Sequence, residues 1–407
     1  MTPKGGVMMN RRHFIKALMA AGVSVLSPVG LAASGGMADY GNLLILVELK
    51  GGNDGLNTVV PYADPSYMSL RPRIAIPRDD VLQLTETAGF HPSLKPLLPL
   101  WQSRELALVQ GIGYPAANLS HFRSIEIWDT ASKSDEYLSD GWLARHFSAV
   151  PPAPTLAADA VIIGSQDRGP LSGGRRVVTL SNPDQFARQA ERQPRRQIGH
   201  PGQGMAGSAQ KSALAHIHGV EDDIRQAASQ LIVRRGQTLQ TVFPDGAFGN
   251  TVRIAAQVLA SGGEGLAVPA LRLTHGGYDT HQNQPGQHAN LLRQLAEGLV
   301  ALRAALVELG LWQRTVVMTY AEFGRRPKEN QSNGTDHGTA NVHFALGGRV
   351  RGGFYGAAPE LGRLDGNGNI AHAVDFRSYY ATALERLWQI DSRDALRGRF
   401  PAMDFLA

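Results

Sequence analysis

The sequence alternates short apolar runs with a long helical pattern, and this alternation limits the fold more than any other feature. Apolar runs of strand length occupy residues 43–49, 106–109, 270–273 and 316–318. After the third run, leucines at spacings of four and three predict an amphipathic helix over residues 288–311. Strands separated by helices in this order are typical of a mainly parallel sheet that is covered on both faces. The sequence therefore predicts an α/β protein with a three-layer α/β/α sandwich.

Polar, glycine-rich loops follow these apolar runs. The first run ends at GGNDG (51–55), the third at HGGYD (275–279) and the fourth at EFGRR (322–326). In open parallel sheets, ligands bind beyond the carboxyl ends of the strands. We therefore expect the functional site of the protein to be built from these loops.

The first 38 residues have the composition of an export signal. Arg11 and Arg12 precede an apolar segment that glycines and a proline interrupt, and small residues follow it. A membrane anchor is the alternative, but these interruptions and flanks are typical of a twin-arginine signal peptide, with cleavage near Ala33 or Ala38. We predict export by the twin-arginine translocase, a location in the periplasm or outside the cell, and no stable membrane span after cleavage.

Residues 39–407 are predicted to form a single domain. A polar segment near residues 182–212, rich in Gly, Gln and Arg, interrupts the alternation and predicts a mobile surface insertion. The formal charge of +5 includes four cations from the first 38 residues, so the rest of the chain carries +1. Proteins that bind phosphate backbones need dense basic runs, so the composition argues against nucleic acid as a partner.

The chain contains no cysteine. This absence excludes disulfides, thiolate metal ligands and a cysteine nucleophile. Any metal must therefore be held by oxygen and imidazole groups, which suit divalent ions. Carboxylates and histidines gather in the loops that follow the strands. The candidate metal ligands are Asp54, Asp279, His281, Glu322, Asp336 and His337.

A hydroxyl and an imidazole are adjacent in NLSHFRS at residues 118–124. The candidate catalytic groups are Ser120 and His121, and the candidate substrate-binding groups are Asn53, Arg123 and Arg325. Ordinary structural explanations remain open, namely a helix cap at Ser120, an Asx turn at Asp54 and a solvated loop around the arginines. The stretch 322–338 is expected to be a loop that covers the pocket.

Several of these stretches together resemble one bacterial family. The matching motifs are LVELKGGNDGLNTVVPY, GFHPSLKPL, NLSHFRS, GGYDTHQNQ, EFGRRPKENQSNGTDHG and LGGRVRGGFYG. They resemble the domain of unknown function 1501 family, whose members carry twin-arginine signals and belong with the sulfatases to the alkaline-phosphatase-like superfamily. The resemblance implies an alkaline-phosphatase-like fold. It also implies one or two divalent ions (Zn, Mn, Mg or Ca), which activate a Ser or Thr nucleophile and clamp a phosphate or sulfate group.

Carried over position by position, the resemblance assigns roles to residues of the first three loops. It implies that Asp54 is a metal ligand and that Ser120 occupies the nucleophile region. It further implies that Asp279 binds a metal together with His281 or His288. These assignments rest on motif positions alone.

The resemblance leaves two alignments open for the last ligands. In the first, the family's adjacent Asp-His pair falls on Glu322 and Phe323, and His337 is the closing histidine. Phe323 cannot bind a metal, although His121 could replace the missing imidazole. In the second, Asp336 and His337 are the ligand pair and His343 closes the site.

The activity that the resemblance implies is hydrolysis of a small anionic ester, a phosphate or a sulfate. The nucleophile would be a serine or a metal-activated water. The residues from Ser120 to Arg123 do not match the Cys/Ser-X-Pro-X-Arg motif from which sulfatases make formylglycine, so standard sulfatase chemistry is disfavoured. The alternative is a non-catalytic, exported binding or assembly protein that keeps the fold.

Overall fold

The computed structural model describes residues 38–180, 238–263 and 265–407. The predicted signal peptide and the predicted insertion near residues 182–212 lie outside these residues, so both stay predictions. None of the described helices is long and apolar enough to cross a membrane.

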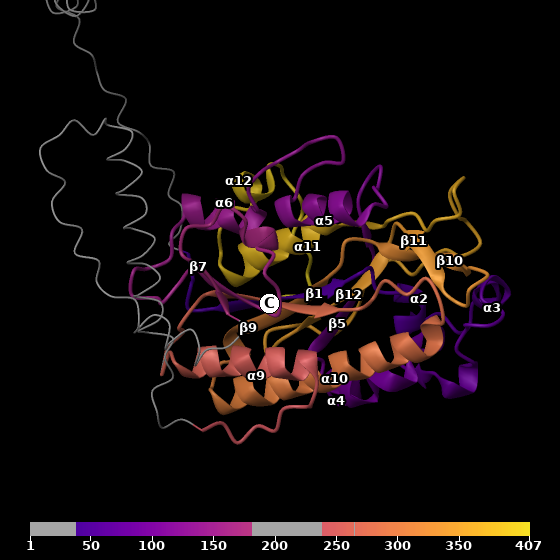
Figure 1. The fold of residues 1–407 in the computed structure, drawn as a ribbon, viewed down its shortest axis with the longest axis horizontal. Coiled ribbons are helices and arrows are strands. Elements are labelled where there is room, and N and C mark those ends of the chain that lie inside the picture. Colours follow the sequence, from indigo (N-terminus) through magenta and orange to yellow (C-terminus); the bar gives the residue numbers. More distant parts are fainter. Residues whose placement is uncertain (1–37, 181–237, 264) are drawn as a thin grey trace, which may run out of the picture. The chain divides into compact units, whose positions relative to one another are not determined.

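A nine-stranded sheet forms the centre of the described part of the chain (Figure 1). Its order is β13-β5-β12-β9-β1-β8-β6-β7, and β14 also pairs with β5. All of these pairings are parallel except the two that β12 makes. The strands are β1 (Leu43–Lys50), β5 (Leu106–Gly113), β6 (Ala160–Ile163), β7 (Val177–Leu180), β8 (Ala270–Gly276), β9 (Thr315–Tyr320), β12 (Asn341–Leu346), β13 (Gly353–Gly356) and β14 (Val374–Asp375).

Helices cover both faces of this sheet (Figure 1). One face carries α4 (Leu98–Gln102), α9 (Ala247–Ala260) and α10 (Gln284–Glu308), and the other carries α5 (His121–Thr130), α6 (Trp142–Ala149), α11 (Phe376–Thr382) and α12 (Arg393–Leu396). Side chains of a strand alternate between the faces, so Ile45 joins the first core while Leu44 and Leu46 join the second. The predicted three-layer, mainly parallel sandwich is confirmed. The predicted helix over residues 288–311 is α10, which begins four residues earlier.

Two smaller sheets lie outside the main one. The strands β2 (Val59–Val60), β3 (Leu82–Gln83) and β4 (Gly89–Phe90) form the first, next to the short helices α2 (Gly55–Thr58) and α3 (Pro65–Leu70). The strands β10 (Gly324–Glu329) and β11 (Thr335–Gly338) form the second. The stretch 322–338 was expected to be a loop, and this expectation was wrong. Its two halves satisfy each other's backbone groups, and Asn330 closes the turn by accepting hydrogen bonds from Ser332 and Gly334.

The neighbouring strands β1 and β8 end at the same level, with Lys50 opposite Gly276. Each is followed by a glycine with positive φ, +115° at Gly51 and +106° at Gly277. The loops then pack tightly, since a Cβ atom on Gly51 would lie 2.4 Å from the backbone nitrogen of Asp279. The end of the sheet therefore brings together loops that are more than 200 residues apart in the chain.

Candidate metal centre

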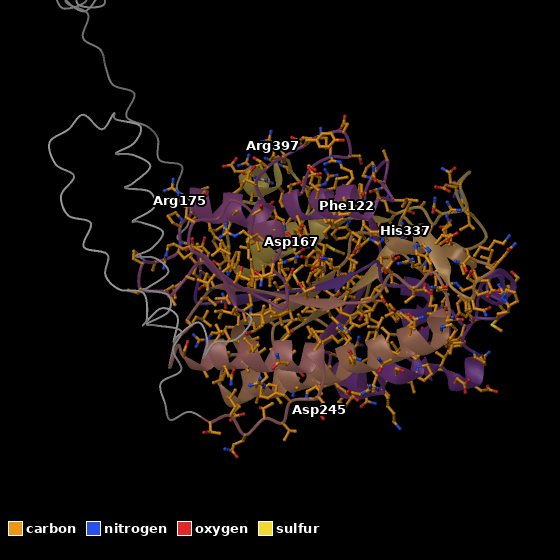
Figure 2. All side chains as sticks on the ribbon, in the orientation of Figure 1. Phe122, Asp167, Arg175, Asp245, His337 and Arg397 are labelled. Carbon is orange, nitrogen blue, oxygen red and sulfur yellow. The ribbon has the colours of Figure 1, made fainter. Side chains whose placement is uncertain are left out.

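Four of the predicted site residues converge beyond the ends of the strands. His121 opens α5, and Asp279 and His281 follow β8. His337, which Figure 2 labels, lies on β11. One oxygen of Asp279 lies 3.1 Å from Nε2 of His281 and 3.3 Å from Nε2 of His337. Its other oxygen lies 3.3 Å from Nε2 of His121. The two nitrogens Nε2 of His281 and His337 are 2.9 Å apart.

The second ring nitrogen of each histidine contacts an acceptor outside the cluster. These Nδ1 contacts join His121 to Glu322 (3.0 Å), His281 to Asp336 (3.2 Å) and His337 to the carbonyl oxygen of Leu119 (2.7 Å). A carbonyl or an ionised carboxylate can only accept a hydrogen bond, so each Nδ1 carries the proton. In the neutral ring, each Nε2 then keeps its lone pair and directs it toward the cluster.

The Nε2 lone pairs of the three imidazoles thus all face the carboxylate of Asp279. Such acceptors repel one another unless a cation or a shared proton lies between them. Atoms that share a tetrahedral ion at about 2.0–2.1 Å lie roughly 3.3 Å apart, close to the separations observed here. Histidines that bind metals commonly donate the other ring N–H to a carboxylate or a carbonyl. The residues present therefore fit a divalent ion.

Within the part of the chain that the structure describes, His121, Asp279 and His337 form a group whose potential ligand atoms all lie within 4.8 Å of one another. His281 adds a third nitrogen, and so a fourth possible ligand atom, beside Asp279 and His337. The side chain of Asp279 is 45% exposed and that of His281 is 42% exposed, so the cluster is open to solvent. An open cluster can exchange an ion and can admit a substrate.

The charges around the cluster set its proton affinities. Burial alone would raise the pKa of Asp279, but the hydrogen bond and charge of Arg325 lower it to about 2. The hydrogen bond to Glu322 is the main cause of a raised pKa at His121. Burial is the main cause of a lowered pKa at His337. Asp279 is therefore ionised at neutral pH, and His121 takes up a proton more readily than His337.

Glu322 supports the cluster. It is almost completely buried, and besides His121 it accepts the backbone N–H of Gly51 at 2.9 and 3.1 Å. Phe323 is buried too, and it stacks on the ring of His337 with centroids 4.2 Å apart and planes 28° apart. Phe323 occupies the position where the resemblance expects a histidine ligand. It cannot bind a metal, but its ring stacks on His337 and so orients that imidazole.

Asp54 lies in a different environment. Its carboxylate is fully buried and forms an ion pair with Arg71, with oxygen–nitrogen distances of 2.6 and 3.0 Å. It also accepts hydrogen bonds from the side chain of Gln284 and the backbone of Leu56. The structure therefore places this predicted ligand in a salt bridge outside the histidine cluster.

The predicted anion-binding arginines have all of their strong contacts within the protein. Arg325 is 2% exposed, and its guanidinium donates to Asp279 and to the carbonyls of Gly51, Gly52, Tyr278 and Thr335. The expectation of a solvated loop is therefore wrong for Arg325. Arg123 donates to the carbonyls of residues 133, 134 and 136 and lies over the ring of Tyr137, so it fixes the loop that follows α5.

Three further candidates lie inside the protein. Asn53 is fully buried and is held by Thr58 (2.9 and 3.1 Å) and by His288 (2.9 Å). Burial lowers the pKa of His288 and of His343 to about 3, and both stay neutral. Neither histidine contacts the cluster. Of the alternatives that the sequence left open, the structure therefore brings His281 and not His288, and His337 and not His343, to Asp279.

Ser120 is exposed and caps α5 without a side-chain hydrogen bond to the first turn. Its two neighbours are both tied to the cluster, because the carbonyl of Leu119 binds His337 and the ring of His121 contacts Asp279. Sequence reasoning missed Arg71, which no motif marked. The buried contact of Arg71 with Asp54 joins residues 17 positions apart, and only the structure shows it.

Fold and cluster together define an α/β sandwich with an open histidine–carboxylate centre at the carboxyl ends of parallel strands. The chain belongs to the family described as "Protein of unknown function (DUF1501)", whose sequence profile matches residues 83–397. Comparison with curated protein sequences gives no match.

Solved structures with a similar chain path include several bacterial proteins. The PsFucS1 sulfatase from Pseudoalteromonas sp. has 11% identity and a TM-score of 0.38, over 90% of this chain and 72% of that one. The lipoteichoic acid synthase LtaP from Listeria monocytogenes has 10% identity and a TM-score of 0.37, over 89% and 76%. The C-terminal periplasmic domain of EcEptC from Escherichia coli, in complex with Zn, has 9% identity and a TM-score of 0.36, over 75% and 72%. At these values the similarity does not extend to individual site residues.

Proposed function

We propose that the protein is a metal-dependent hydrolase of phosphate or sulfate esters. One observation carries the proposal: three histidines with Nδ1 held outside the cluster direct their Nε2 atoms toward the carboxylate of Asp279. Four polar side chains at an exposed edge add little to folding, so their convergence favours a functional site. The membership of the chain in an alkaline-phosphatase-like superfamily, which its motifs imply, agrees with this chemistry.

The ligand set favours particular ions. Imidazole nitrogens suit Zn²⁺ and other transition metals, whereas Mg²⁺ and Ca²⁺ prefer sites built from oxygen ligands. Three histidines and one carboxylate therefore favour Zn²⁺ over Mg²⁺ and Ca²⁺. An ion in this position would polarise the ester and stabilise the negative charge that develops on the transferred group.

Ser120 is our candidate nucleophile. It is exposed, and the residues on both sides of it are held to the cluster, so its backbone is fixed beside the centre. His121 lies next to it in the chain and keeps its proton on Nδ1. In the proposed reaction the serine oxygen displaces the alcohol of the ester, and water then releases phosphate or sulfate from the serine.

The amino end of α5 supports binding of the anionic group. The first turn of this helix has no side-chain cap, so its N–H groups remain available at the positive end of the helix dipole. These N–H groups would take the role that was predicted for Arg123 and Arg325, because Arg325 is bound to protein acceptors and Arg123 is directed into the loop that follows α5.

The test is turnover of chromogenic phosphate monoesters, phosphate diesters and sulfate esters by metal-loaded protein. We expect Ser120→Ala to lower kcat by at least about 100-fold, since loss of a nucleophile removes the covalent step. The matched control is Ser69→Ala, which changes an exposed serine in α3 and should leave turnover unchanged. Full turnover by Ser120→Ala would rule out the serine, and no turnover on any ester class would end the proposal.

A second candidate is a non-catalytic binding protein. The observation that favours it is the fourth possible ligand, Nε2 of His281, because four protein ligands can saturate a tetrahedral ion and leave no position for a substrate. The metal affinity of His281→Ala discriminates the binding protein from the hydrolase. If His281 is a fourth ligand that saturates the ion, its loss should abolish tight binding. In the hydrolase, His121, Asp279 and His337 should retain the ion without it.

We also propose that the protein is exported through the twin-arginine route to the periplasm or beyond. The support is the sequence of the first 38 residues, and the absence of a membrane-spanning helix among the described residues is compatible with it. Replacement of Arg11 and Arg12 by lysine should retain the protein in the cytoplasm, and fractionation of cells measures this directly.

A further inference from the structure

Asp54 and Arg71 form a buried ion pair that the proposed metal centre does not use. Both side chains are fully buried. The pairing is bidentate, with NH1 of Arg71 2.6 Å from one oxygen of Asp54 and NH2 3.0 Å from the other. Bidentate pairs of this kind are among the strongest polar contacts in proteins.

Every donor of this arginine has a partner. Besides Asp54, the guanidinium donates to the side-chain oxygen of Asn57 (2.7 Å) and to the carbonyls of Arg326 (2.9 Å) and Pro327 (2.7 Å). A guanidinium has five N–H groups, and these contacts use all of them. Arg71 is therefore fixed in position and orientation.

The carboxylate of Asp54 is saturated in the same way. One oxygen also accepts the backbone N–H of Leu56 at 3.2 Å, and the other accepts the side-chain N–H of Gln284 at 2.5 Å. A metal ion could reach Asp54 only by displacing Arg71. That displacement would leave a buried, unpaired guanidinium, which is strongly unfavourable.

We propose that the protein holds one divalent ion, at the His121–Asp279–His337 centre with His281, and that Arg71 is a fixed internal cation at Asp54. The guanidinium then stands where a second ion would otherwise neutralise this carboxylate. The inference rests on the proposed metal centre and extends it to the number of ions. It also makes Arg71 a positioning residue.

The ion pair is connected to the loops that carry the ligands. Gln284 donates to Asp54, and its side-chain oxygen accepts from Thr280 (3.1 Å) and Thr335 (2.6 Å). Thr280 lies between Asp279 and His281 in the chain, and Thr335 lies two residues before His337. Arg71 also holds two carbonyls of β10, which pairs with β11. Asp54 and Arg71 thus set the relative positions of the two loops that meet at the centre.

The test is the number of Mn²⁺ ions bound by the purified, full-length chain. Equilibrium dialysis with elemental analysis should give one ion per chain. Electron paramagnetic resonance should show the six-line spectrum of an isolated Mn²⁺. Two ions per chain, or the spectrum of a spin-coupled pair, would overturn the inference.

Variants separate the two carboxylates. We expect Asp279→Asn to weaken Mn²⁺ binding by about a thousandfold, because it removes a ligand. Asp54→Asn should weaken binding by no more than about tenfold, because Asp54 lies outside the ligand set. If Asp54→Asn does not fold, the double variant Asp54→Leu with Arg71→Met removes both charges together and should still bind one ion. Loss of Mn²⁺ binding in either folded variant of Asp54 would contradict the proposal.

This measurement does not depend on turnover. A chain that binds one ion and hydrolyses no ester would end the hydrolase proposal and leave the single-ion centre standing. A chain that binds no Mn²⁺ and no Zn²⁺ would overturn both.

Discussion

Two aspartates of this protein follow neighbouring parallel strands in almost the same sequence, GGND at residues 51–54 and GGYD at residues 276–279. The first, Asp54, is fully buried and pairs with a guanidinium. The second, Asp279, is 45% exposed and lies among imidazoles. The difference teaches that the loop pattern delivers a carboxylate to the edge of the sheet, while the surrounding segments decide which cation it meets.

Burial explains why the partners differ. A carboxylate that is removed from water needs a cation that folds with it, and Arg71 is joined to the same chain. Burial raises the pKa of Asp54, and the charge and hydrogen bonds of Arg71 more than reverse the effect. A carboxylate at the surface can instead exchange its cation with the solvent. Asp54 is therefore suited to structure, and Asp279 is suited to a reversibly bound ion.

The largest effect that tests this comparison is loss of a ligand. His337→Ala removes one Nε2 and leaves the backbone of β11 in place. We expect the affinity for Zn²⁺ to fall by about a thousandfold, beyond the ten- to hundredfold that loss of an outer hydrogen-bond partner costs. Calorimetric titration measures it. The control is His372→Ala, which changes a half-buried histidine outside the cluster and should leave the affinity unchanged.

The next effect concerns the buried pair. Arg71→Met leaves the carboxylate of Asp54 buried without its cation, so the free energy of unfolding should fall by about 3–5 kcal/mol. Urea unfolding measures the change. The matched control is Arg293→Met, which breaks an exposed pair with Glu297 on α10 and should cost less than about 0.5 kcal/mol. Equal costs for the two variants would contradict the view that Asp54 needs this cation.

A smaller effect concerns the carboxylate behind His121. Glu322→Gln keeps an oxygen that can accept from His121 but removes the negative charge that helps to raise the pKa of this histidine, and the Zn²⁺ affinity at pH 8 should fall by about 10–100-fold. Protons compete with the ion, so binding by the unaltered protein weakens as the pH falls through the raised pKa of His121. In the variant this loss should begin at a lower pH.

Titrations between pH 5 and 8 compare the two proteins. Without metal, the raised pKa means that protonated His121 stabilises the fold below its unfolded pKa and that this contribution is lost as the pH rises through the folded pKa. The control is Glu329→Gln, which changes a buried glutamate at the end of β10 that pairs with Arg73 and not with His121. An unchanged pH dependence in Glu322→Gln would show that Glu322 does not act through His121.

The smallest effect concerns the stacked ring. Phe323→Leu keeps an apolar side chain but removes the stacking on His337, so stability should fall by about 0.5–1.5 kcal/mol. Zn²⁺ affinity should fall only a few-fold, because Phe323 touches a ligand and supplies none. Thermal unfolding with and without Zn²⁺ measures both effects, and Phe354→Leu, at a partly buried ring outside the centre, is the control.

Much of the fold could be predicted from the sequence. The apolar runs gave β1, β8 and β9, because buried parallel strands read as continuous apolar segments. The helix α10 followed from its leucine spacing. The hairpin of β10 and β11 was missed, since its polar residues lack an alternating apolar pattern and its pairing depends on the backbone and the turn.

The site could be predicted only in part. Asp279, His281 and His337 were named from glycine-rich loops and from the family resemblance, and the structure brings them together with His121. The environment of Asp54 could not be predicted, because its partner Arg71 follows a short helix and carries no signal of its own. A single arginine acquires a role only through the long-range packing that buries it, which sequence spacing does not record.

The ligand atoms of the centre come from residues 121, 279, 281 and 337, on three separate segments of the chain. An unfolded chain has no such arrangement, so the ion can bind only after the central sheet has assembled. In the proposed centre, uptake of the ion would follow folding, and the metals present in the compartment where folding finishes would decide which ion is captured. The proposal therefore makes the identity of the ion depend on the place of folding as well as on the ligand set.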